Sequence, residues 1–246
     1  MSDVVDTIEY KGYKVEIVND PYCDDNPRSW ANVSRMVFFH KRYSFPNDAN
    51  IDEDEFSSWA EIAEELEKEH GALLLTPVYM YDHSGLAFRA GRGFGDIDPG
   101  SWDSGLVGIM YATQESIMEA HGSLNEEARE KARKNMEAEL ETYGHWVNGE
   151  VYGYRVYRPG DDDDFESTWG FFGYGWDKNG MRESWEDIID CDIRHLGKHT
   201  KTVRATVDFD VVVERGEGPR EVLAAMLAEA YPHDKVRGAR LVDDED

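Results

Sequence analysis

Acidic residues outnumber basic residues two to one in this chain, with 52 Asp and Glu against 26 Lys and Arg and a formal net charge of -26 over 246 residues. Crowded like charges oppose a compact state, so any fold must place them on its surface. Phosphate binding needs a basic surface, and we therefore expect no direct binding of nucleic acid. The 7 Trp, 13 Tyr and 10 Phe are too many for a disordered acidic chain and favour a folded protein with an acidic coat.

The charge is concentrated in two segments of the sequence. Residues 48–69 hold ten acidic residues and one lysine, and residues 161–192 hold eleven acidic and two basic residues, a net of -9 in each. If the two segments are neighbours in the fold, they form one polyanionic face; if they are not, the charge is a general coat. The residues expected to form the acidic surface are Asp52, Glu53, Asp54, Glu61, Glu64, Glu65, Asp161, Asp162, Asp163 and Asp164.

The order of hydrophobic patterns predicts an α+β fold, with a central antiparallel or mixed sheet and several covering helices. Pro77 lies inside one of the expected strands and indicates a sheet edge or a bend at that point. Thr113 is expected to cap a helix. The strands are expected near residues 13–17, 33–40, 72–81, 86–89, 106–111, 149–157 and 168–174, and the helices at 54–70, 114–121, 124–143 and 181–195.

The C-terminal segment has a different texture from the rest of the chain. Residues 202–213 alternate strongly and contain few aromatic residues, and an Ala- and Leu-rich helical segment and a short strand-like segment follow. We therefore predict a main α+β domain over residues 1–198 and a small β-α-β appendage over residues 199–246.

Two glycine-containing turns hold the residue types most suited to chemistry. The blocks PVYMYDHSG and WDSGLVGIMYAT each place an aspartate at a junction between a strand and a turn, and Asp82, His83 and Asp103 would together suit a metal ion or an acid–base pair. The alternative is that these side chains hydrogen-bond their own turns. No metal-ligand spacing such as HExxH occurs, and no cofactor is expected.

The cysteine content and the apolar runs bear on the compartment. Two cysteines, Cys23 and Cys191, fit a reducing compartment in which no disulfide framework is expected. The acidic start MSDVVDTIEY lacks the apolar stretch of a signal peptide, and no apolar run reaches the roughly 18 residues of a membrane span. We expect a protein of the cytoplasm, without membrane contact.

Several blocks, in order, carry a resemblance to a known group of proteins: DNPRSWANVSRMVFFHKRY, PVYMYDHSG, WDSGLVGIMYAT, ETYGHWVNGEVYGYRV and WGFFG. Over roughly residues 10–195 the chain resembles a family of small acidic proteins encoded by tailed phages and mobile elements. The resemblance implies a viral or mobile-element context, hence the cytoplasm of a host cell; the family has no established activity, and the resemblance transfers no catalytic residue to this chain.

Three hypotheses for function follow. The first is a non-enzymatic accessory protein that binds a basic host protein, such as a DNA-binding protein or a restriction enzyme, by imitating DNA in an anti-defence role. The second is an acidic coat adapted to a salt-rich interior, in which case the protein should lose structure in dilute buffer. The third is a metal-assisted enzyme centred on Asp82, His83 and Asp103.

Overall fold

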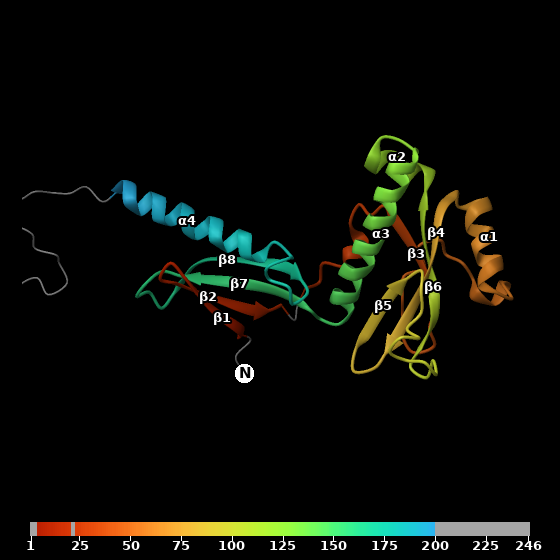
Figure 1. The fold of residues 1–246 in the computed structure, drawn as a ribbon, viewed down its shortest axis with the longest axis horizontal. Helices are drawn as coiled ribbons and strands as arrows, with labels where there is room; N and C mark the ends of the chain where they lie inside the picture. The colour runs from red at the N-terminus through yellow and green to blue at the C-terminus, as the bar shows by residue number, and fades with distance from the viewer. Residues whose placement is uncertain (1–3, 21–22, 200–246) are drawn as a thin grey trace, which may run out of the picture. The chain divides into compact units, whose positions relative to one another are not determined.

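The computed structural model describes residues 4–20 and 23–199, so the appendage expected over 199–246 lies outside the described residues apart from its first residue. The strands are β1 (Val4–Tyr10), β2 (Tyr13–Asn19), β3 (Ser34–Phe38), β4 (Ala72–Asp82), β5 (Leu86–Ala90), β6 (Ser104–Thr113), β7 (Val151–Tyr157) and β8 (Asp164–Phe172) (Figure 1). The α-helices are α1 (Trp59–Glu69), α2 (Gln114–His121), α3 (Glu126–Val147) and α4 (Met181–His199), and short 3-10 helices lie at Pro27–Ser29 (η1) and Glu53–Glu55 (η2).

The described strands form two antiparallel four-stranded sheets, in the orders β1-β2-β7-β8 and β3-β6-β4-β5. This confirms the α+β class, with the strands divided between two sheets instead of gathered in one. The whole of the second sheet lies in the sequence between β2 and β7 of the first. None of the helices in the described part is long and apolar enough to cross a membrane.

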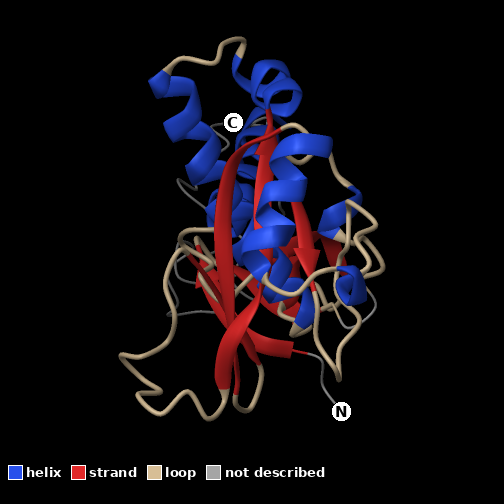
Figure 2. Ribbon diagram, turned by 90° about the vertical axis from the view of Figure 1, so that its right-hand side faces the viewer, coloured by secondary structure: helices blue, strands red, loops and turns tan. Residues whose placement is uncertain are grey.

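Helices cover both faces of the sheet β3-β6-β4-β5 (Figure 1). Alternate residues of a strand point to opposite faces. Met36 and Met110 therefore pack towards α3, whereas their neighbours Val37 and Ile109 pack towards α1. The strands are long and twisted, as Figure 2 shows. Burial on both faces explains why apolar residues follow one another without alternation at 36–38 in β3 and at 109–112 in β6.

The sheet β1-β2-β7-β8 has a core of its own against α4. Val15, Ile17, Tyr154 and Val156 pack with Trp185 of the helix, and all are fully buried. The Tyr154 hydroxyl and the Ser184 hydroxyl are hydrogen-bonded at 2.7 Å, which satisfies the polar end of the buried tyrosine. β1 was not predicted as a separate strand; two of its seven residues are acidic and four are exposed, so that it lacks a clear apolar pattern.

Local signals fix most of the helix ends. Thr113 and Ser116 form the capping box of α2, and Gly122 ends this helix in a left-handed conformation with a φ of 68°. The helix predicted over 54–70 begins at Trp59 instead, because the Ser58 hydroxyl accepts a hydrogen bond from the Glu61 amide and caps it there. Residues 53–55 form the separate 3-10 turn η2.

Pro77 lies just beyond the residues of β4 that pair with β5, although its carbonyl accepts from the Gly91 amide at 2.8 Å. It is opposite Ile109 of β6, and pairing with β5 begins at the next residue, Val78. The missing amide hydrogen of proline therefore leaves no partner in β5 unsatisfied. The sheet edge indicated by the sequence is present at this point of β4.

Candidate functional site

Apart from Asp48, the acidic residues of the first segment face away from the core. α1 buries Ile62 and Leu66 against the sheet, which leaves its glutamates outside. Within residues 52–69 the described structure contains a single ion pair, from Lys68 to Glu64 at 3.2 Å. Of the residues predicted for this surface, Asp52, Glu53, Asp54, Glu61 and Glu64 are exposed and Glu65 is half-buried.

Several of these charges are placed against the local stability of the helix. Glu67 and Glu69 lie in the last turn of α1, where the helix dipole disfavours negative charge. Glu65 is four residues from both Glu61 and Glu69, and like charges at this spacing repel by a few tenths of a kcal/mol. The helix therefore carries more negative charge than its own stability favours.

The second acidic segment is more fully compensated. Lys11 binds Asp190 at 2.5 Å, and Arg182 binds Glu186 at 3.0 Å and also contacts Asp177. Asp161, Asp162, Asp163 and Asp164 are exposed at the turn before β8 and at its first residue. The two segments thus have equal net charge in the sequence but differ in how much of it is paired.

Asp192 is the most strongly held carboxylate of this segment. Arg158 donates from Nε and Nη2 to its two oxygens, both at 2.8 Å, and the Tyr13 hydroxyl donates to Oδ2 at 2.8 Å. These hydrogen bonds, that from Arg158 foremost, hold the pKa of Asp192 below its ordinary value. The bonds join β2, the end of β7 and α4.

We expect Asp192→Asn to lower the free energy of unfolding at pH 7 by about 1.5–3 kcal/mol, the range for hydrogen bonds to a charged group. A carboxyl group whose pKa is lower in the folded state stabilises the fold above the unfolded pKa and loses this effect as the pH falls through the folded pKa. The difference between the variant and the parent should therefore shrink below about pH 4. Urea titrations between pH 2.5 and 7 measure it; a difference that does not depend on pH would contradict the assignment.

The two acidic segments belong to different cores. α1 packs with Val37, Ile109 and Tyr111 on the sheet β3-β6-β4-β5, whereas β8 and α4 pack on the sheet β1-β2-β7-β8. No ion pair or shared hydrophobic cluster joins the two segments in residues 4–20 and 23–199. The acidic surface is thus carried by two separately packed parts of the chain.

The structure brings His83 and Asp103 together but directs Asp82 elsewhere. His83 Nδ1 lies 3.5 Å from Asp103 Oδ2, and the Asp82 amide donates to the Asp103 carbonyl at 2.8 Å. The Asp82 carboxylate binds the Arg42 guanidinium and accepts from the Tyr43 hydroxyl at 3.0 Å. Successive residues at the end of β4 point to opposite faces, which separates the side chains of Asp82 and His83.

The predicted metal cluster is therefore not supported. Among the described residues, no three His, Cys, Asp or Glu side chains converge as metal ligands would. Asp82 and Asp103 do line a common pocket of about 250 Å³, together with His40, Arg42 and Trp102. Trp102 was not among the residues predicted for a site, although its position between a Pro-Gly pair and an aspartate is typical of a surface loop.

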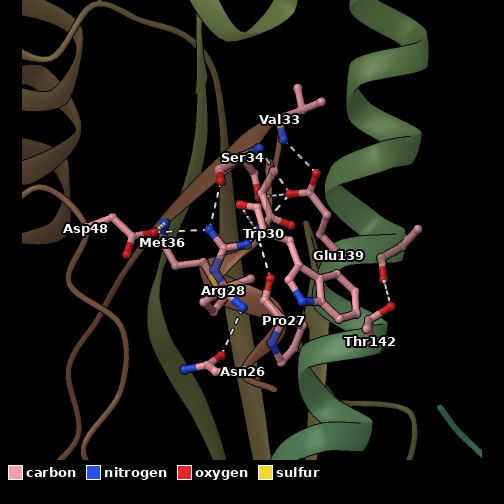
Figure 3. A network of polar contacts seen from close by, with 12 residues as sticks. Asn26, Pro27, Arg28, Trp30, Val33, Ser34, Met36, Asp48, Glu139 and Thr142 are labelled. Carbon is pink, nitrogen blue, oxygen red and sulfur yellow. Dashed lines mark hydrogen bonds and ion pairs between the residues drawn. The ribbon is translucent and has the colours of Figure 1, made fainter. Parts of the chain in front are cut away.

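A buried arginine and two carboxylates form a second polar group that the sequence reasoning missed (Figure 3). In the run DNPRSW, the Asn26 side chain caps η1 and Pro27 begins it, and this short turn carries Arg28 inwards. The Arg28 side chain is only 7% exposed and lies 3.1 Å from Asp48 Oδ2 and 3.7 Å from Glu139 Oε2. It also donates to the Ser34 carbonyl at 2.7 Å.

Both carboxylates also accept hydrogen bonds from backbone amides in or next to β3. Glu139 accepts from the amides of Val33 and Ser34 at 2.8 and 3.0 Å, and Asp48 accepts from the Met36 amide at 2.7 Å. Glu139 thus has donors on both oxygens and Asp48 has two on Oδ2, and the group fastens α3, β3 and the loop at residue 48 to one another. Its chemistry is that of a structural ion network, because its charges already bind one another.

His145 and Glu150 form a further close pair at the end of α3. His145 Nδ1 and Glu150 Oε2 are 2.6 Å apart, and the ring packs against Gly173, where a Cβ atom would lie 2.7 Å from Nε2. Gly173 has a φ of 80° and its amide donates to the Glu150 carbonyl. The pair therefore holds the connection between α3 and β7 against the segment that follows β8.

The chain was compared with protein-family models, with curated proteins and with solved structures, and none of the three comparisons gives a match.

Proposed function

We propose that this protein acts by binding a basic partner protein through the acidic face of residues 52–69. The observation that carries the proposal is the charge of this segment: nine exposed or half-buried acidic residues, with one ion pair among them in the described structure. Charges that a helix holds against its own stability are explained if a cationic surface compensates them on binding.

The density of charge favours a partner that normally holds nucleic acid. A helix of 11 residues is about 16 Å long, and duplex DNA carries one charge per about 1.7 Å of axis, roughly ten charges over that length. α1 itself has five acidic residues and one lysine, a net of -4, and residues 52–58 before it add four acidic residues, giving -8 for the whole segment 52–69. Together with the resemblance to phage and mobile-element proteins, this supports a host DNA-binding protein or restriction enzyme as the partner.

The test compares two charge-neutralised variants of the full chain. Glu61→Gln/Glu64→Gln/Glu67→Gln removes three charges from α1, and Asp161→Asn/Asp162→Asn/Asp163→Asn removes three from the turn before β8. We expect the first to weaken binding to a purified DNA-binding enzyme at least tenfold and the second to change it less than twofold, because the contact is placed on α1. Calorimetric titration at 50 and 200 mM KCl gives both affinities, and the affinity of the parent should fall steeply with salt.

Two results would contradict the proposal. Equal losses in both triple variants would show that the charge acts as a general coat and not through α1. Absence of salt-dependent binding across a panel of restriction enzymes and other basic DNA-binding proteins would remove the partner class. Circular dichroism of each variant in dilute buffer serves as the control for folding and separates a binding protein from a salt-adapted one.

A further inference from the structure

Trp102 is a large apolar side chain that the fold leaves in solvent. It is 89% exposed, the highest value among the large hydrophobic residues of the described part. Its indole lies over Gly100, where a Cβ atom would be 2.1 Å from the Trp102 Nε1 atom. The ring therefore lies against the backbone of Gly100, and a side chain at position 100 would displace it.

The loop that carries Trp102 is held at both ends. Asp98 is only 8% exposed, and its carboxylate accepts from the amides of Trp102 and Asp103, both at 3.1 Å, and from the Ser104 hydroxyl at 2.8 Å. At the other end, Phe94 is buried and stacks on Tyr81 with ring centroids 5.5 Å apart. An exposed aromatic residue on an ordered loop loses little conformational entropy on binding, which is typical of an interaction hot spot.

The pocket beside the indole is lined by two carboxylates together with Arg42 and His40. Of the two carboxylates that line it, Asp82 is occupied by Arg42 and Tyr43, whereas Asp103 is about half exposed and has His83 at 3.5 Å. The charge of Arg42 is offset by Asp82. At about 250 Å³ the pocket is smaller than the usual 300–1,000 Å³ of a cofactor or drug site and suits one inserted side chain.

We infer that Trp102 and Asp103 bind an arginine side chain of a basic partner protein. A guanidinium stacks on the face of an indole and pairs in its plane with a carboxylate, and tryptophan is the best of the aromatic residues for this contact. The inference rests on the proposed function, since it gives the basic partner a second point of contact, on a different segment from α1. The acidic residues 52–69 then attract the basic partner over a longer range, and the pocket at Trp102 and Asp103 binds one of its arginine side chains specifically.

The test uses the full chain and a short blocked peptide, acetyl-Gly-Arg-Gly-amide, with the neutral citrulline peptide as the matched probe. The chain has 7 Trp, and the indole N–H signal of Trp102 is assigned by its loss in Trp102→Phe. We expect the arginine peptide to shift the Trp102 signal in the millimolar range and the citrulline peptide to leave it in place. Trp102→Ala and Asp103→Asn should each weaken arginine binding about fivefold to tenfold.

Trp169→Ala is the matched control, because Trp169 is also partly exposed but lies over Gly153 and beside Arg155. It should leave arginine binding unchanged. Equal shifts with both peptides, an equal loss in Trp169→Ala, or a shift of Trp102 by a neutral oligosaccharide and not by the arginine peptide would each overturn the inference. The α1 triple variant should keep its arginine response, so a failure of this site and a failure of the proposed function give different results.

Discussion

Replacing Arg28 with alanine is expected to lower the free energy of unfolding by about 3–5 kcal/mol, the effect of removing one partner from a buried ion pair. Arg28 is the only cation that the structure places between Asp48 and Glu139 in the described residues, and its side chain is almost fully buried. Without it, Glu139, which is 15% exposed, and the partly exposed Asp48 lose the cation that they share. The loss should therefore exceed that of a surface ion pair several times over.

Urea denaturation followed by tryptophan fluorescence measures this effect at pH 7. Arg133→Ala is the control, since Arg133 lies on the exposed side of α3 and pairs at 3.2 Å with Glu126 and Glu130. Exposed pairs of this kind contribute about 0.2–1 kcal/mol. A similar small value for both arginines would show that the Arg28 network is not a stabilising element.

A single added methyl group at Gly108 is expected to destabilise the fold by about 3 kcal/mol, at the upper end of the range for overpacking. Gly108 lies on β6 opposite Phe38 of β3. A Cβ atom there would lie 2.3 Å from the Val37 carbonyl oxygen and 2.3 Å from the Phe38 ring. Because one of these obstacles is backbone, Gly108→Ala can be accommodated only if the two strands move apart.

Gly105→Ala on the same strand provides the comparison. A Cβ atom at Gly105 meets nothing within 4 Å, and glycine inside a strand has an entropic disadvantage relative to alanine. This variant should be neutral or slightly more stable than the parent in the same urea titration. If the two alanine variants unfold at the same urea concentration, β3 and β6 do not approach each other at Gly108 as closely as described.

Features that depend on neighbouring residues could be predicted from the sequence. The Thr113 cap, the turn between β4 and β5 and the antiparallel pairing of β7 with β8 are confirmed, because each is decided within a short stretch of chain. The predicted start of α1 at residue 54 was five residues too early, and here too the true start is decided by residues close in the sequence. Acidic residues suit the first turn of a helix, but the Ser58 hydroxyl was the stronger signal.

Features that depend on distant residues could not be predicted. Val33 and Glu139 are separated by 106 residues, and nothing in the run DNPRSW indicates that a glutamate of α3 meets it. The side chains of Asp82, His83 and Asp103 do not converge as metal ligands would. The turn brings their backbones together, but the Asp82 carboxylate points to Arg42. The greater number of ion pairs in the second segment also depends on the cations Lys11 and Arg158, which lie outside the two segments.

The position of β2 and β7 on either side of the other sheet in the sequence determines when the protein can fold on the ribosome. Glu16 and Tyr157, which hydrogen-bond across these strands, are separated by 141 residues. At a synthesis rate of roughly 5–20 residues per second, β7 is completed about 7–28 s after β2. During that time β2, with the apolar side chains of Val15, Ile17 and Val18, lacks its partner strand β7. Strands β3 to β6 can pair with one another earlier. We expect repulsion between the negatively charged nascent chains to prevent the hairpin of β1 and β2 from aggregating before β7 is made.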